Sequence, residues 1–99
     1  MNKKQRAALA FEQQSSGIDY GKRIAKVVIN KFPNGFTESI GDEVTAITES
    51  ALAVVIDTLA TNGVGKCYRD PFKDGFYIGL RNTFTDYAND CAARSSRAA

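Results

Sequence analysis

Residues 70–91 read DPFKDGFYIGLRNTFTDYANDC, and this stretch decides the fold class. Aspartate is a favoured helix N-cap, and Pro71 at the first helical position loses no hydrogen bond, because the N–H at that position has no partner in any helix. Large apolar side chains then recur with a 4-4-3-4 spacing, at Phe76, Leu80, Phe84, Tyr87 and Cys91. This spacing places them on one face of a helix. We therefore expect a helix from Asp70 that buries this stripe in the core.

The same stretch contains Gly75 and Gly79, spaced i, i+4. Each glycine inside a helix costs up to about 1 kcal/mol relative to alanine. The pair is explained if another backbone approaches closely there, either within the molecule or across a dimer interface. It is equally well explained by tolerance of glycine near a helix start, and the sequence leaves both explanations open.

The clearest amphipathic segment lies upstream, at residues 39–61. One wide stripe holds its apolar residues: Ile40, Val44, Ile47, Ala51, Leu52, Val54, Val55 and Leu59. Thr37 or Ser39 is the expected N-cap, and Asn62-Gly63 the expected C-terminal cap. This segment is predicted to be a helix.

A shorter helix is expected at residues 19–32. Its apolar half carries Tyr20, Ile24, Val27, Val28 and Phe32. Proline disfavours helical geometry in the residue before it, so Pro33 should end the helix, and Asn34-Gly35 supplies a tight turn.

The first residues predict a separate arm helix, about Lys3 to Gln14. Ser15-Ser16-Gly17 is typical of a helix stop, and Ser16 with Asp19 has capping-box spacing for the next helix. Residues 92–99 lose periodicity and should fray. The whole chain, residues 1–99, is thus expected to be a single all-α domain: a small helical bundle of three to four helices, antiparallel and up-and-down, with residues 1–16 as an arm.

Composition supports one small soluble domain. Hydrophobic residues make up 43% of the 99 residues and charged residues 24%, which is ordinary for a globular protein. The longest mainly apolar stretch, Ala51 to Leu59, is far shorter than the roughly 20 residues that cross a bilayer, so we expect no membrane contact. Two cysteines suit a cytoplasmic protein with free thiols.

The sequence gives little support to catalysis. It contains no histidine, the commonest catalytic base, and we expect no enzyme activity, no metal and no cofactor. Cys67 lies beside Lys66 and two residues before Arg69, a setting that can activate a thiol. An incidental loop thiol is the simpler interpretation.

Charge is divided along the chain. Residues 1–31 carry a net +5, residues 32–62 a net −5 and residues 63–99 a net +2. Four acidic residues form one candidate protein-binding face: Glu38, Asp42, Glu43 and Glu49. Six basic residues form a second face, suited to a protein or to nucleic acid: Lys3, Lys4, Arg6, Lys22, Arg23 and Lys26.

These features favour a non-enzymatic protein-interaction module. By analogy of type, short helical chains without catalytic signatures are common among phage or mobile-element accessory proteins that bind a host protein as inhibitors or adaptors. The alternative is a nucleic-acid-binding protein that uses the basic arm and the following helix. A homodimer is also expected, because two long apolar stripes exceed what one small core can bury.

Overall fold

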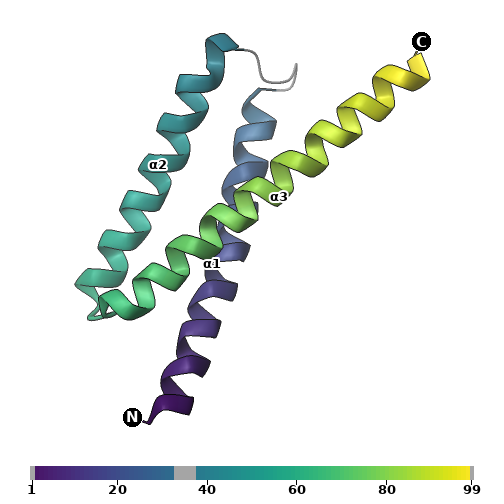
Figure 1. Cartoon of the computed structure of the whole chain (residues 1–99). Helices are drawn as coiled ribbons and strands as arrows, with labels where there is room; N and C mark the ends of the chain where they lie inside the picture. The colour runs from purple at the N-terminus through teal and green to yellow at the C-terminus, as the bar shows by residue number, and fades with distance from the viewer. Residues whose placement is uncertain (1, 33–37, 99) are drawn as a thin grey trace.

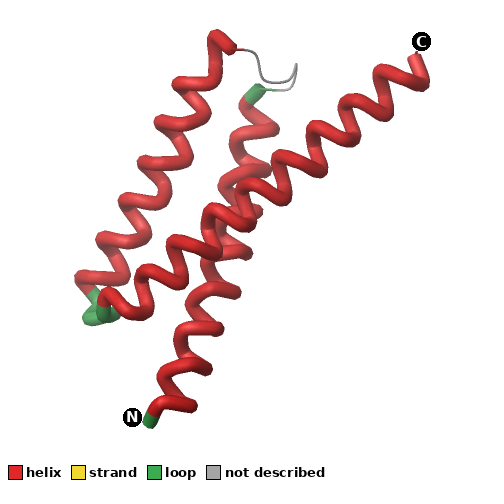
Figure 2. The backbone as a smooth tube through the Cα atoms, in the orientation of Figure 1, coloured by secondary structure: helices red, strands yellow, loops and turns green. Residues whose placement is uncertain are grey.

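Three α-helices make up the computed structural model, which describes residues 2–32 and 38–98. Helix α1 spans Lys3–Lys31, α2 spans Glu38–Thr61 and α3 spans Lys66–Ala98 (Figure 1). The described residues contain helix and short connections without any strand (Figure 2). The all-α prediction is confirmed, with three helices rather than four.

Helix α1 is continuous, so the predicted break at Ser15-Ser16-Gly17 is wrong. Gly17 is buried inside the helix and does not cap it. The helix begins with a capping box that the sequence analysis overlooked: the Gln5 N–H donates to the Asn2 side chain at 2.8 Å, and the Asn2 N–H donates to the Gln5 side chain at 3.0 Å. It ends at Lys31, two residues before Pro33, as predicted.

The break fails because α1 crosses α3 through a contact made of four glycines, Gly17 and Gly21 from α1 and Gly75 and Gly79 from α3. We call this contact the glycine crossing. A Cβ atom on Gly17 would collide with the carbonyl oxygen of Phe72, and one on Gly75 with the carbonyl oxygen of Gln14. Gly21 and Gly79 meet the opposite backbone in the same way.

The glycine crossing answers the question left open by Gly75 and Gly79. Without side chains between them, the two backbones touch, which allows the weak Cα–H···O contacts that recur between closely packed helices. Gly17 lies at Phe72 and Gly21 at Phe76, so α1 and α3 run in the same direction through the contact. The close approach is therefore within the molecule, and it offsets the helix-propensity cost of the glycines.

A small core lies beside the crossing. Its buried cluster contains Ala25 from α1, Leu52 from α2, and Phe76 and Leu80 from α3. The Tyr20 ring lies 5.6 Å from the Phe76 ring and 6.1 Å from the Phe72 ring, centroid to centroid. Of the stripe predicted on α3, Phe76 and Leu80 are buried, whereas Phe84, Tyr87 and Cys91 are half-buried.

Helix α2 ends as predicted. Gly63 has φ of 81°, and the Val64 N–H donates to the Leu59 carbonyl at 2.9 Å while the Gly63 N–H donates to Ala60 at 3.1 Å. This is a Schellman cap. Helix α2 begins at Glu38, so Ser39 lies within the helix, whereas Thr37 and the Asn34-Gly35 turn lie outside the described residues.

Helix α3 is longer than predicted at both ends. Its first turn is held by bonds from the Tyr68 and Arg69 N–H groups to the Gly65 carbonyl, each 3.0 Å, so Pro71 is not the first helical residue. At the other end the helix runs to Ala98, through the segment expected to fray. Ala92, Ala93 and Arg94 are strong helix formers, which favours this extension.

The molecule is elongated. It measures 58 × 24 × 16 Å, and its radius of gyration of 16.2 Å exceeds the roughly 13 Å of a compact domain of this length. The N-terminal part of α1 and the C-terminal part of α3 extend away from the other helices, and α2 lies along one side (Figure 1). Much helix surface is therefore left exposed.

Candidate protein-interaction surface

The acidic residues proposed as a binding face lie on α2, but not on one side of it. Asp42, Glu43 and Glu49 are exposed. Glu49 borders a hollow of about 260 Å³ between α2 and α3, together with Lys73 and Tyr77. Glu43 lies about 120° away around the helix, at 100° per residue, and points to the other side. The Glu38 side chain lies outside the described part of the structure.

The basic residues proposed as a binding face all lie on α1, and all six are exposed. Because α1 is continuous, the arm and the following segment form one rod. Lys4 and Lys22 are separated by about 27 Å at 1.5 Å per residue, and they lie at the same angle around the helix. The structure thus joins two basic groups, Lys3 to Arg6 and Lys22 to Lys26, along a single helix.

The described charges of α1 and α2 do not pair with one another. Across residues 2–32 and 41–94, where side chains are described, no ion pair joins α1 to α2. The exposed charges of both helices are therefore available to a partner.

Two valines predicted to face the core are exposed instead. Val27 on α1 is 58% exposed and Val54 on α2 is 66% exposed. Each lies at the edge of its predicted apolar stripe, and α3 covers only the other side of the α1–α2 hairpin. The physical reason for the error is the number of neighbouring helices. With three helices rather than four, each helix has fewer neighbours and buries a narrower apolar stripe.

The helical repeat groups these valines with charged residues. Arg23, Lys26 and Val27 share one side of α1, and Glu43, Val54 and Asp57 share one side of α2. All six are exposed. We call this set the hairpin face.

A hollow opens at the seam between α1 and α2, next to the hairpin face. Its volume is about 300 Å³. The walls come from Asp19, Tyr20 and Arg23 of α1 and Val55 of α2, with the buried Phe72 of α3 also lining it. The hairpin face is thus an indented surface with apolar side chains and charges of both signs.

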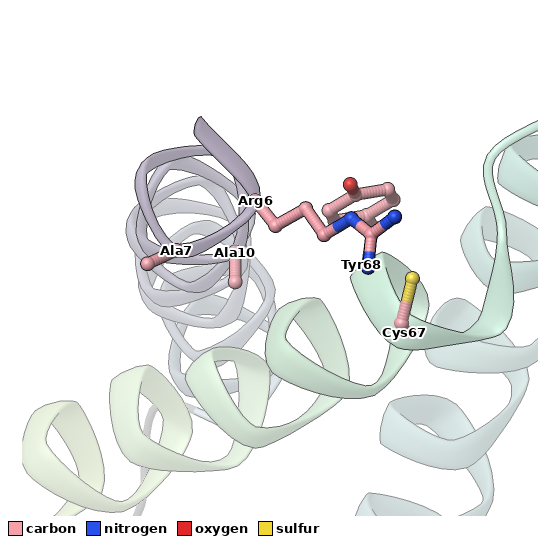
Figure 3. Close-up of a pocket in the computed structure, with 5 residues that line it drawn as sticks. All are labelled: Arg6, Ala7, Ala10, Cys67 and Tyr68. Atoms are coloured by element: carbon pink, nitrogen blue, oxygen red, sulfur yellow. The ribbon is translucent and has the colours of Figure 1, made fainter. Parts of the chain in front are cut away.

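A larger hollow of about 580 Å³ lies where α1 and α3 diverge, and it contains Cys67. Figure 3 shows Arg6 reaching from α1 toward Tyr68, with Cys67 beside them on the first turn of α3. Ala7 and Ala10 complete the lining. The Cys67 thiol is exposed and stands at the mouth of this hollow.

The second thiol, Cys91, is half-buried on α3. It forms a side-chain hydrogen bond with Tyr87, and this bond is the main cause that raises the pKa of Tyr87 above its usual value. The two residues belong to the predicted apolar stripe, in the part that extends beyond the core.

Helix α2 contains an apolar window longer than the stretch from Ala51 to Leu59. Residues Gly41–Thr61 are long and apolar enough to cross a bilayer by length and composition, and 11% of that window is buried. If α2 crossed a membrane, however, the C-terminal end of α1 and the N-terminal end of α3 would lie on opposite sides of that membrane. Keeping the glycine crossing would then carry Lys22, Arg23 and Lys26 into hydrocarbon, at roughly 2.5–3.5 kcal/mol each. A spanning α2 and the glycine crossing therefore exclude one another.

Sequence reasoning missed the two residues that make the hairpin face apolar, Val27 and Val54, since each belonged to a stripe assigned to the core. Their position at the stripe edges was the available signal. No protein-family model, curated protein or solved structure matches the chain.

Proposed function

We propose that this protein is a non-enzymatic protein-interaction module, of the type found among phage or mobile-element accessory proteins that inhibit or adapt a host protein. The observation that supports this most is the hairpin face, which combines exposed valines with exposed charges, and no ion pair joins α1 to α2 among the described side chains. Large exposed apolar side chains beside polar rims are typical of protein-binding sites. In this proposal the three helices form an up-and-down, antiparallel bundle in the cytoplasm.

The test is capture of a partner from the native host followed by charge reversal. One variant is Arg23→Glu with Lys26→Glu, and the other is Glu43→Lys with Asp57→Lys, so that each reverses two exposed charges of the hairpin face. Rim charges steer association more than they hold a domain together, so both variants should keep the thermal midpoint and lose partner affinity. A control, Asp86→Lys with Asp90→Lys, reverses two exposed carboxylates on the distal part of α3. Equal binding by all variants would remove the α1 and α2 charges from the proposal.

A second candidate function, nucleic-acid binding, is favoured by the continuity of α1. The two basic groups along one rod are spaced to contact phosphates over about 27 Å. Titration of salt against affinity for a random-sequence duplex separates the two functions. Phosphate neutralisation predicts a steep loss of affinity with salt, and Lys4→Glu with Lys22→Glu should reduce that slope. No measurable duplex binding at low salt would reject it.

A further inference from the structure

We propose that the hairpin face is a self-docking surface, on which a second copy of this chain binds about a two-fold axis that runs along the α1–α2 hairpin. The proposal rests on the protein-interaction function above and names one partner. It starts from charge: the hairpin face carries Arg23 and Lys26 on α1 and Glu43 and Asp57 on α2.

Complementary charges lie at matching heights on the two helices. The Tyr20 hydroxyl donates to the Ala51 carbonyl at 3.4 Å, so these two residues lie at similar heights along the hairpin. Helix α2 runs beside α1 in the opposite direction (Figure 1). Lys26 is six residues beyond Tyr20, about 9 Å along α1, and Glu43 is eight residues before Ala51, about 12 Å along α2. Lys26 and Glu43 therefore lie at similar heights, within about one helical turn of each other.

A two-fold axis parallel to the hairpin preserves these heights. It places α1 of one copy opposite α2 of the other, so Lys26 of each copy faces Glu43 of its partner. The contact is self-complementary, as a closed dimer requires. Within one copy Lys26 and Glu43 are both exposed and no ion pair joins them, so each can pair with the other copy.

The apolar part of the hairpin face also fits a second copy. Among the described side chains of the hairpin, Val27 and Val54 are large, aliphatic and exposed; Val27 is one helical turn from Arg23 and Val54 is next to Val55, and both Arg23 and Val55 line the hollow at the α1–α2 seam. Rotation about the axis brings the α1–α2 seam of one copy against that of the other. Val54 of each copy then faces α1 of the other copy, where α1 lines the hollow. Dimerisation thus removes from water the two valines that the single chain leaves exposed.

The experiment uses the purified full-length chain and sedimentation velocity. The wild type should sediment at twice its 10.8 kDa mass in low salt and shift toward monomer as salt is raised. Arg23→Glu with Lys26→Glu makes both helices of the hairpin face acidic, and Glu43→Lys with Asp57→Lys makes both basic. Each variant alone should be monomeric, because its like charges now oppose one another across the axis.

An equimolar mixture of the two variants should restore the dimer, because the acidic face of one now fits the basic face of the other. Circular dichroism confirms that each variant is folded before mixing. The control Asp86→Lys with Asp90→Lys should dimerise like the wild type. A wild type that is monomeric at all concentrations, or folded variants whose mixture stays monomeric, would overturn the proposal. Capture of a host partner by a monomeric chain would overturn self-docking alone and leave the proposed function standing.

Discussion

Replacing Gly75 with alanine should destabilise the protein, although alanine is the better helix former. In an open helix the substitution gains about 1 kcal/mol. At Gly75 the new methyl group would collide with the Gln14 carbonyl oxygen and come within 3.0 Å of the Ile18 backbone nitrogen. Backbone atoms cannot rotate aside, so α1 and α3 must separate along the glycine crossing.

The size of the loss follows from these two opposing effects. Overpacking costs typically about 1–3 kcal/mol, and the rigid obstacle favours the upper end. Subtracting the gain in helix propensity leaves a net loss of about 2 kcal/mol. With a urea m-value of about 1–2 kcal/mol/M, the unfolding midpoint followed by circular dichroism should fall by about 1–2 M. A domain of this size has only a modest margin of stability, so the change is easily measured.

Gly41→Ala is the matched control. Gly41 also lies inside a helix, but a Cβ there meets nothing within 4 Å. The same substitution should therefore raise the midpoint at Gly41 and lower it at Gly75. If both variants are stabilised alike, the α1–α3 backbone contact does not exist in solution. If the loss at Gly75 varies with protein concentration, the close approach is between molecules and the fold described above is wrong.

Further outcomes follow from single positions. The far-ultraviolet circular dichroism spectrum should be strongly helical, and a strand-dominated spectrum would reject the fold. Leu80→Ala should lower the free energy of unfolding by about 2–5 kcal/mol, measured with denaturant, and Phe84→Ala should lower it less, since Leu80 is buried and Phe84 half-buried. If both variants keep the wild-type unfolding midpoint, neither side chain lies in the core. Gly63→Ala should cost about 1–2 kcal/mol, because Gly63 has φ of 81°, whereas Gly65→Ala should change stability little. Cys91→Ala should lower the pKa of Tyr87, followed by ultraviolet titration, because it removes the hydrogen bond that raises it; an unchanged titration curve would contradict that bond.

Local sequence signals predicted the helices where no tertiary contact competes with them. Gly63 ends α2 and Pro33 follows the end of α1, since both act through backbone geometry that neighbours do not alter. Ser15-Ser16-Gly17 misled the prediction because its local preference for a helix end is outweighed by packing against α3. The close approach of two helices requires glycines on both, and only the pair on α3 was considered.

The positions of the charged residues were predicted in part. The acidic residues were assigned to one helix, and the basic residues to two helices that the structure joins as α1. Their grouping was not, since Glu43 and Glu49 point to different sides of α2 and only the position of α3 decides which side stays open. Val27 and Val54 were assigned to the core for the same reason: helical periodicity gives the direction of a stripe, but the number of neighbouring helices sets its width.

The central claim, that the hairpin face is where this protein binds its partner, is tested most directly by nuclear magnetic resonance of the valine methyl groups. A dilution series of the wild-type chain should shift the Val27 and Val54 methyl signals progressively, while the signals of Val28, which is fully buried, stay in place. Raising the salt concentration should reproduce the dilution shifts, because salt weakens the Lys26–Glu43 pairing between copies. Signals of Val27 and Val54 that do not change with either concentration or salt would contradict the account.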